Sequence, residues 1–338
     1  MLPKVSVITP IYNGQVYAKE LVNNLHKQSF ESVEFIILDD GSSDGTLLEL
    51  EEQVGFLNDP RFVIIQKKNT GVSDTRNVGI STSMGEYIIF MDSDDNIPEC
   101  FVEKYYEKIK KNGTDIEFFP VNKTEEKNVT QITGTQFVFD NLYSGEILNS
   151  SQILKLIFDF SLPGYPFGYI SRKELWNNSF FPKDIHFTED LYALVDILTN
   201  NHVHGHINKE KYYNYVQRSS SIMHNAGEKE EIASDIVTDR IINLLILRNI
   251  DEDIIKQAIN FSLGHYIVHS ENAVIRGNVA LFEKYKKSLW TKFMKSQMSL
   301  KARINKFVKI IVLFIPSTVI LRKILIYKRI LTKQEPIK

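Results

Sequence analysis

The sequence predicts a Rossmann-like α/β fold, in which a mostly parallel sheet carries helices on both faces, followed by a helical C-terminal region. Over about the first 120 residues, short apolar runs alternate with segments whose apolar residues recur at helical spacing. Near-continuous apolar strands between amphipathic helices are typical of a parallel sheet that is buried on both faces. From Glu228 to about Leu289 the periodicity is helical, which predicts the C-terminal helices.

The alternation begins at the N-terminus. Val5–Ile11 is an apolar run rich in β-branched residues, so we expect a strand there, and Val16–Gln28 has the apolar spacing of a helix. Val33–Leu38 is a second apolar run and predicts the second strand, which is followed by helical spacing at Thr46–Val54. Arg61–Gln66 predicts a short third strand. Ligands of such sheets bind at the carboxyl ends of the strands, so functional residues are expected just after them.

The same alternation continues to about residue 120. Ser73–Ser81 has helical spacing, and the apolar run Glu86–Met91 predicts a fourth strand. Pro98–Lys111 predicts a further helix, and Asp115–Val121 a fifth strand. The strands expected up to this point are therefore separated by helices, as a parallel sheet requires.

The composition then changes along the chain. Residues 122–145 are polar and rich in Thr, Asn and Gly, so we expect a loop or small insertion, and Ser150–Tyr215 is of mixed character. We predict a nucleotide-binding domain over 1–225, a helical domain over 226–299 and a basic amphipathic tail over 300–338.

Composition and charge exclude several classes of protein. The chain has 338 residues, 43% of them hydrophobic, which is enough for a sizeable core and two domains. A net charge of −2 gives no sign of a nucleic-acid partner. The single cysteine, Cys100, excludes a disulfide framework and indicates a reducing compartment. Because the N-terminus also lacks the pattern of a secretion signal, we expect a cytoplasmic protein without nucleic acid.

The tail from Leu300 differs from the rest of the chain. It carries ten Lys or Arg against one acid, Glu335, so its charge is +9 and the remainder is near −11. Its uncharged run Ile310–Leu321, broken by Pro316, is too short to span a bilayer of roughly 30 Å. An apolar centre with basic flanks suits a helix lying in the interface of an anionic membrane, here the inner face of the cell membrane. The alternative is a basic helix that packs on its own protein or on a sister subunit of a homo-oligomer.

Carboxylates are concentrated after two of the predicted strands. Asp92, Asp94 and Asp95 follow the fourth strand, and Asp39 and Asp40 follow the second. Because parallel strands end at the same edge of a sheet, we expect the two groups to lie together. Like charges this close raise one another's pKa unless a cation relieves them. A hard divalent ion with oxygen ligands, Mg²⁺ or Mn²⁺, would do so.

These segments also fit other motifs in part. Taken alone, the group Asp92, Asp94 and Asp95 also fits a solvated turn that caps the helix starting near Pro98. Ser42, Ser43 and Asp44 are expected to cap the helix from Thr46. The spacing from Asp40 to Glu51 matches a calcium-binding EF-hand loop, but a strand enters it where that motif requires a helix. No glycine-rich phosphate loop follows the first strand.

The motifs taken together resemble family-two glycosyltransferases of the GT-A fold, of the type that builds bacterial polysaccharides and teichoic acids. They are "VSVITPIYNG", "FIILDDGSSDGT", "NTGVSDTRNVGI", "GEYIIFMDSDD" and "FTEDLYALVDIL", in this order over about the first 220 residues. The resemblance implies a UDP-sugar donor lying across the strand ends. Pro10 and Tyr12 would flank the base, Asp40 would accept the N3–H of uracil, and Arg76 would approach the base or the diphosphate.

The resemblance also implies roles for the acidic residues. Asp92 and Ser93 would contact the nucleotide, with Asp92 at the ribose or in the shell of the metal ion. Asp94 would bind Mn²⁺ or Mg²⁺, and His224 is a further candidate for the metal or the diphosphate. Asp190 would be the catalytic base, and Glu189 would support the acceptor. Asp95 is either a supporting charge or a helix cap.

The sequence therefore predicts a metal-dependent, inverting glycosyltransferase of hexosyl or N-acetylhexosaminyl type. Its acceptor would be a hydroxyl of a glycan, a lipid-linked saccharide or a cell-surface polymer such as a capsule or teichoic acid. The aromatic stretch Pro163–Tyr169 is expected to form the acceptor floor or, alternatively, an ordinary turn on the core. A nucleotidyltransferase and a non-catalytic sugar-binding module are the alternative functions.

Overall fold

The computed structural model describes residues 2–126, 128–136, 145–218, 227–296, 300–315 and 318–332. The chain divides into two compact units. The first contains Met1–Ile157 and Ser161–Arg218, and the second contains Phe158–Phe160 and Ser219–Lys338. The functional domain limits predicted from the sequence stay a prediction.

The first unit is built on a mostly parallel sheet. Within the described residues the sheet has eight strands in the order β3-β2-β1-β4-β9-β5-β10-β8. Neighbours run parallel except that β9 is antiparallel to β4 and β5, and β8 is antiparallel to β10. The strands are β1 (Val5–Ile11), β2 (Val33–Asp39), β3 (Phe62–Gln66), β4 (Tyr87–Phe90), β5 (Ile116–Phe118), β8 (Leu148–Asn149), β9 (Tyr169–Arg172) and β10 (His204–Ile207).

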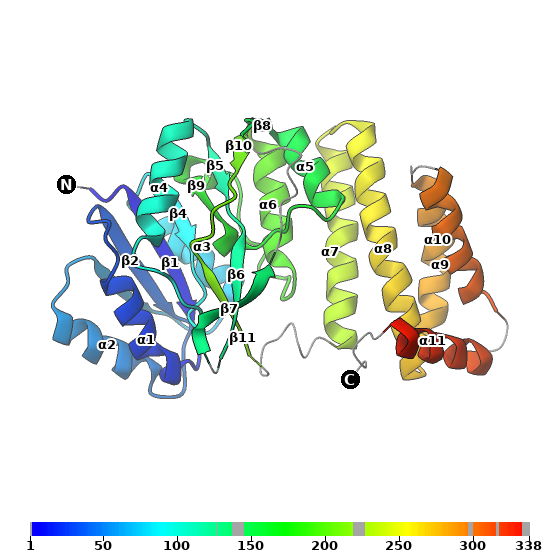
Figure 1. The fold of residues 1–338 in the computed structure, drawn as a ribbon, viewed down its shortest axis with the longest axis horizontal. Helices are drawn as coiled ribbons and strands as arrows, with labels where there is room; N and C mark the ends of the chain where they lie inside the picture. The colour runs from blue at the N-terminus through cyan, green and yellow to red at the C-terminus, as the bar shows by residue number, and fades with distance from the viewer. Residues whose placement is uncertain are drawn as a thin grey trace. The chain divides into compact units, whose positions relative to one another are not determined.

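Helices cover both faces of this sheet (Figure 1). They are α1 (Gln15–His26), α2 (Thr46–Leu57), α3 (Val72–Thr82), α4 (Phe101–Asn112), α5 (Ser150–Phe158) and α6 (Glu189–Asn200). On one face Val7 and Phe35 pack in a core with Leu21 of α1 and Tyr105 of α4. On the other face Gly79 of α3 lies directly against Ile8. Burial of both faces explains the continuous apolar strands and confirms the predicted α/β fold class.

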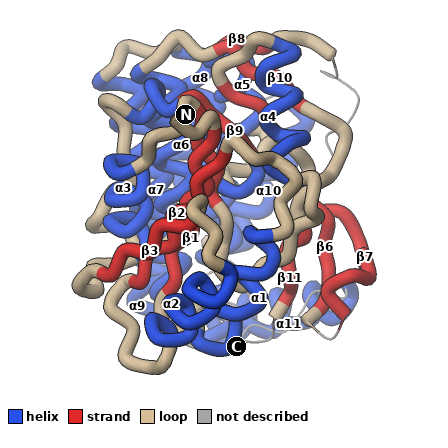
Figure 2. The backbone as a smooth tube through the Cα atoms, turned by 90° about the vertical axis from the view of Figure 1, so that its left-hand side faces the viewer, coloured by secondary structure: helices blue, strands red, loops and turns tan. Residues whose placement is uncertain are grey.

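A second, smaller sheet corrects one expectation. Residues 122–145 were expected to form a loop or small insertion, but β6 (Val121–Glu125) and β7 (Asn128–Gln136) form an antiparallel pair there. β6 also pairs in parallel with β11 (Asn214–Gln217), which gives the order β11-β6-β7 (Figure 2). A polar strand on a small sheet lacks the apolar alternation that sequence patterns detect, so its pairing partner decides its structure.

The second unit is helical, as predicted. Its helices are α7 (Glu228–Leu247), α8 (Glu252–Arg276), α9 (Val279–Lys295), α10 (Leu300–Leu313) and α11 (Thr318–Thr332). Leu263, Phe282, Leu289, Ile310 and Leu325 belong to a common core. Among the described residues, none of the helices combines the length and the apolar character needed to cross a bilayer.

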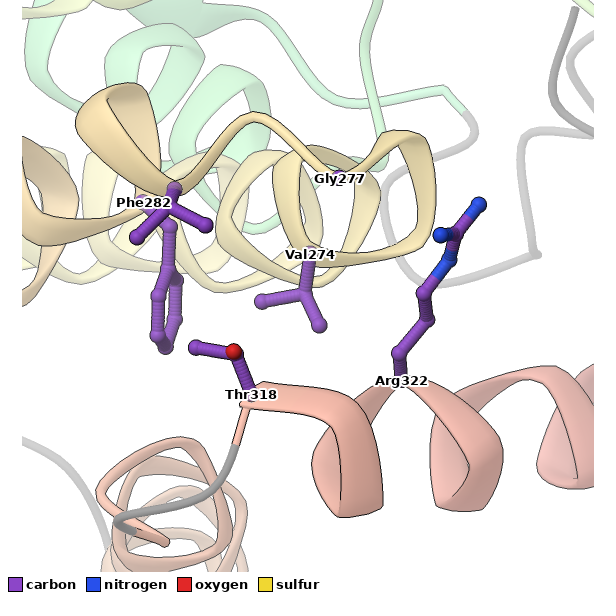
Figure 3. A pocket seen from close by; sticks show the side chains of 6 residues that line it. Val274, Gly277, Phe282, Thr318 and Arg322 are labelled. Carbon is purple, nitrogen blue, oxygen red and sulfur yellow. The ribbon is translucent and has the colours of Figure 1, made fainter.

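α11 lies beside the turn that joins α8 to α9, and a hollow remains between them (Figure 3). Val274, Val279 and Phe282 supply its apolar walls. Thr318 and Arg322 line it from α11. The hollow thus combines apolar walls with one cationic side chain.

Candidate active site

The two acidic segments leave the sheet at one edge. β1 pairs in parallel with both β2 and β4, and the register places Ile11 opposite Asp39 and Ile8 opposite Phe90. The residues after Asp39 and after Phe90 therefore emerge on the same side of the molecule. Tyr12 follows β1 at this edge and its side chain is 52% exposed.

Hydrogen bonds hold the ends of β1 and β2 together. The Asn13 N–H donates to Ser42 Oγ at 2.8 Å, and the Ser43 N–H donates to Asn13 Oδ1 at 2.8 Å. Gly41 has φ +71°, and a Cβ there would lie 2.7 Å from the backbone nitrogen of Asn69. Only glycine fits that position without strain. Ser42 and Ser43 thus join two loops, which differs from the capping role expected of them.

Asp44 takes up the expected capping role. Its Oδ1 accepts the N–H of Thr46, the first residue of α2, at 3.0 Å. Burial alone would raise the pKa of Asp44, but hydrogen bonds from the Thr46 side chain and backbone and from the Gln15 backbone lower it below its ordinary value.

Asp40 is held rigidly in a nearly buried position. Its Oδ1 accepts hydrogen bonds from Lys67 Nζ at 2.7 Å and from the Thr70 N–H at 3.0 Å, and its Oδ2 accepts the Gly71 N–H at 2.9 Å. These contacts join the end of β2 to the segment that opens α3. Lys67 carried no signal in the sequence, because its partner comes from a different strand.

Asp95 anchors the second acidic segment. Tyr213 Oη donates to its Oδ2 at 2.7 Å, and the Val216 N–H donates to its Oδ1 at 2.8 Å. Its side chain is buried, and burial together with the charges of Asp92 and Asp94 raises its pKa well above the ordinary value. The N-cap position of α4 is Cys100, so Asp95 supports the segment and does not cap that helix.

Asp94 is more accessible. Its side chain is 42% exposed, and its Oδ2 accepts a hydrogen bond from Arg218 Nη1 at 2.8 Å. Burial and the negative charge of Asp92 raise the pKa of Asp94, while Arg218 opposes the rise. The guanidinium of Arg218 lies 4.8 Å above the ring of Tyr17. Ser93 lines the same hollow as Tyr17, Asp94 and Arg218.

Arg76 connects this segment to a distant part of the chain. Its side chain is buried, and it donates to Glu189 Oε1 at 2.9 Å and to Asp92 Oδ1 at 3.2 Å. Its guanidinium also lies 5.3 Å from the ring centre of Phe181. Arg76 was expected to approach the base or the diphosphate; the structure places it between two carboxylates. A direct nucleotide contact of Arg76 stays a prediction.

Glu189 and Asp190 form the first turn of α6. Thr188 precedes them with φ 60°, in the N-cap position, but its Oγ1 donates to the carbonyl of Phe187 and makes no capping bond. Burial and the adjacent charge of Glu189 raise the pKa of Asp190 to about 7, although Arg76 acts in the opposite direction. A carboxyl with this pKa is suited to accept a proton near neutral pH.

The stretch 163–169 packs against this helix. A Cβ on Gly164 would lie 2.7 Å from Cα of Leu191, so only glycine permits the approach. The rings of Tyr165 and Phe167 are parallel within 5°, with centres 5.3 Å apart. Phe167 in turn stacks on Tyr213 at 4.8 Å. This stack links the start of α6 to Tyr213, which holds Asp95 and was not singled out in the sequence.

Asp92 and Asp94 are the described residues that could hold a metal ion. Among residues described by the structure, no three His, Cys, Asp or Glu side chains are grouped to bind one. His224 lies outside the described residues. Mg²⁺ is commonly held by one or two carboxylates together with substrate phosphates. Burial and the negative charge of Asp92 raise the pKa of Asp94. A dication would relieve the negative charge of these two carboxylates, so the donor set fits such an ion.

Comparisons with known proteins agree with this architecture. Residues 6–173 match the model of the family "Glycosyl transferase family 2". The chain is 28% identical over 232 residues to glycosyltransferase GlyG of Streptococcus pneumoniae, which covers 65% of this chain and 72% of GlyG. It is 29% identical over 195 residues to the uncharacterized glycosyltransferase EpsJ of Bacillus subtilis, covering 56% of this chain and 54% of EpsJ.

Solved structures share the fold. S. aureus TarS 1–349 in complex with UDP-GlcNAc is similar with a TM-score of 0.64 and 23% identity, over 87% of this chain and 82% of that one. Mannosyltransferase PcManGT from Pyrobaculum calidifontis, in complex with GDP-Man and Mn²⁺, is similar with a TM-score of 0.52 and 12% identity, over 92% and 88%. At these identities the likeness is one of fold alone.

Proposed function

Because the chain belongs to glycosyl transferase family 2 and has the GT-A fold, we propose that this glycosyltransferase moves a sugar from a UDP-sugar to an acceptor hydroxyl, with inversion at the anomeric carbon. The observation that carries the proposal is the bridge made by Arg76. It ties Asp92, at the edge where a donor would lie, to Glu189, beside the proposed base. Donor and acceptor chemistry would thus meet at one place.

The donor nucleotide is proposed to lie along the ends of β1, β2 and β4. The exposed ring of Tyr12, with Pro10, would flank the base. Oδ2 of Asp40 accepts one hydrogen bond from the described residues, so a second lone pair is available for the N3–H of uracil. Asp92 and Ser93 would contact the ribose. Among the fold neighbours, TarS binds UDP-GlcNAc and PcManGT binds GDP-Man. The contact proposed between Asp40 and uracil favours UDP here.

Asp94, with Asp92, would hold Mn²⁺ or Mg²⁺ together with the diphosphate. The ion would supply a fixed positive charge that stabilises the negative charge growing on the leaving diphosphate. Arg218 Nη1 donates to Asp94 Oδ2 at 2.8 Å. The guanidinium would therefore contribute positive charge beside this carboxylate, in addition to that of the metal ion. The neighbour PcManGT contains Mn²⁺, which supports the use of a divalent ion.

Asp190 is proposed as the base. As the acceptor oxygen bonds to the anomeric carbon, the bond from that carbon to the β-phosphate oxygen breaks, UDP leaves, and the acceptor proton passes to Asp190. A pKa of about 7 leaves a useful fraction of Asp190 ionised at neutral pH. Glu189, paired with Arg76, would orient the acceptor. The aromatic stack of Tyr165 and Phe167 would form a floor for sugar rings.

The acceptor is proposed to be a glycan, a lipid-linked saccharide or a cell-surface polymer such as a teichoic acid or capsule. The basic tail, 300–338, supports a position at an anionic membrane surface. A hexose or N-acetylhexosamine is the proposed sugar, and the fold neighbour TarS, in complex with UDP-GlcNAc, supports this class of donor.

A panel of UDP- and GDP-sugars, incubated with the purified full chain and Mn²⁺, tests the proposal. We expect release of UDP from one UDP-sugar, stimulated by an acceptor saccharide and stopped by EDTA. Release of sugar 1-phosphate instead, with formation of UTP or GTP when pyrophosphate is supplied, would indicate a nucleotidyltransferase. Binding of a sugar nucleotide without any turnover, in wild type and with all acceptors, would indicate a sugar-binding module.

A further inference from the structure

The helix α10 exposes an apolar stripe. Ile304, Phe307, Val308, Ile311 and Phe314 recur at helical spacing and are between 37% and 55% exposed. The opposite side of the helix is buried through Ile310 and Leu313. An amphipathic helix normally turns its apolar stripe toward its own protein. Here the larger apolar stripe faces outward.

The neighbouring helix α9 extends this surface. Trp290 is 46% exposed and Met294 is 57% exposed. The rings of Trp290 and Phe307 lie 6.3 Å apart, so the two helices present their side chains together. We define the apolar face as Trp290 and Met294 of α9, Ile304, Phe307, Val308 and Ile311 of α10, and Phe314 directly after α10. Contiguous exposed apolar surface on this scale marks an interaction site.

Positive charge accompanies the apolar face. Between residues 300 and 332 the chain has eight Lys or Arg and no Asp or Glu. Arg303 lies with its guanidinium 5.2 Å from the ring centre of Phe293, next to Phe307. Lys309 is exposed on α10. Lys306 differs, because its Nζ donates to Asn260 Oδ1 at 2.7 Å and burial lowers its pKa to about 8.

The helix α11 repeats the same combination. Ile320 and Ile324 are 54% and 42% exposed, and Lys323 and Arg322 are exposed beside them. Arg322 also lines the hollow with apolar walls described above (Figure 3). The second helix of the tail thus carries apolar and cationic side chains with no acidic residue, as α10 does.

We propose that the apolar face inserts into the surface of an anionic membrane, with the basic side chains of α10 and α11 meeting lipid phosphates. Amphipathic helices of this kind bury their apolar side roughly 5–10 Å into the headgroup region. Trp and Phe suit that depth, because their rings partition to the interface. The inference deepens the proposed function by naming the surface of the protein that would enter the membrane, and it rests on that function only for its biological purpose.

Charge argues against a second copy of the chain as the occupant. A two-fold interface places the same surface on both partners, so the cations of one tail would face those of the other. With no acidic residue from 300 to 332 to pair with them, juxtaposed like charges would oppose association. An anionic lipid surface offers the complementary charge and an apolar interior at once.

Vesicle sedimentation tests the proposal with the full chain. We expect binding to vesicles of phosphatidylcholine and phosphatidylglycerol at roughly 3:1, and little binding to phosphatidylcholine alone, since each basic residue near an anionic surface adds attraction. The triple variant Ile304→Ser, Val308→Ser, Ile311→Ser should bind at least about tenfold more weakly. The matched control Ile246→Ser, Leu247→Ser, Val268→Ser changes apolar side chains that are 50% to 79% exposed on α7 and α8, and should bind like wild type.

Tryptophan fluorescence locates the inserted surface. The chain has two tryptophans, and Trp176 is buried whereas Trp290 belongs to the apolar face. Binding should shift the emission to the blue and allow quenching by brominated lipid. Three outcomes would each overturn the proposal. Both triple variants could lose binding equally, or acrylamide could still quench Trp290 when vesicles are present. The wild-type protein could also form a dimer that does not bind vesicles. Release of UDP from a sugar donor in solution is measured separately. A failure of the membrane proposal can therefore be told apart from a failure of the proposed glycosyl transfer.

Discussion

The clearest quantitative expectation concerns the titration of Asp190. Burial and the charge of Glu189 raise its pKa to about 7. If Asp190 is the base, the turnover number rises with pH because the ionised form is required. Roughly a tenth of Asp190 would be ionised at pH 6 and about nine-tenths at pH 8, so kcat should increase nearly tenfold between them.

The substitution Arg76→Gln perturbs this titration. Arg76 lowers the pKa of Asp190 and neutralises Glu189 through a 2.9 Å hydrogen bond. Without it, Asp190 faces an unpaired Glu189. An adjacent arginine lowers a carboxyl pKa by roughly 1–3 pH units, so the midpoint should move up by about 1 or more, and kcat at pH 7 should fall by about fivefold or more. Arg76→Lys keeps the charge and should move the midpoint less.

Initial rates at saturating donor and acceptor, from about pH 5 to pH 9, supply the profile. Thermal unfolding of each variant at the same pH values shows whether it is folded. A midpoint that stays in place in folded Arg76→Gln, or that moves to lower pH, would refute the coupling between Arg76 and Asp190. A profile without an ascending limb near pH 7 in wild type would remove Asp190 from the base role.

Four further predictions concern the same site. Asp190→Asn should lower kcat by roughly 10²–10⁴-fold while UDP binding, measured by calorimetry, stays near wild type. The raised pKa means that ionised Asp190 destabilises the folded state relative to the unfolded state. The free energy of unfolding therefore falls as the pH rises through about 7. Asp190→Asn should therefore raise the free energy of unfolding by up to about 4 kcal/mol at pH 8 and by little at pH 4. An unchanged free energy of unfolding at pH 8 would contradict this prediction. Gly164→Ala places a Cβ 2.7 Å from Cα of Leu191, so denaturant melts should show a loss of about 1–3 kcal/mol. EDTA should stop transfer and Mn²⁺ or Mg²⁺ restore it, whereas Asp94→Asn should require more metal; full activity in chelator would reject the metal assignment.

The strands and their functional edge were accessible from the sequence. Apolar runs such as Val5–Ile11 and Val33–Leu38 form strands because a sheet buried on both faces needs apolar residues at every position. Parallel pairing of β1 with β2 and β4 then brings Asp40 and Asp92 to one edge. The catalytic roles assigned to Asp190, Glu189 and Asp94 came from resemblance and stay predictions.

Contacts between segments that are distant in the chain could not be predicted from the sequence. Asp95 is held by Tyr213 and Val216, more than 100 positions further along the chain. The polar strands β6 and β7 exist because β11 pairs with them. In each case the partner is supplied by the tertiary fold and leaves no periodic signal in the local sequence.

By itself, the sequence determined the α/β alternation, the acidic edge and the basic charge of the tail, because periodicity and composition act locally. Only the tertiary structure decided that Arg76 is buried between Asp92 and Glu189, and that α10 turns its apolar stripe outward while Ile310 and Leu313 face the core. The physical reason is that a charged or apolar side chain is stabilised by the partner it meets, and chain folding, not sequence spacing, selects that partner.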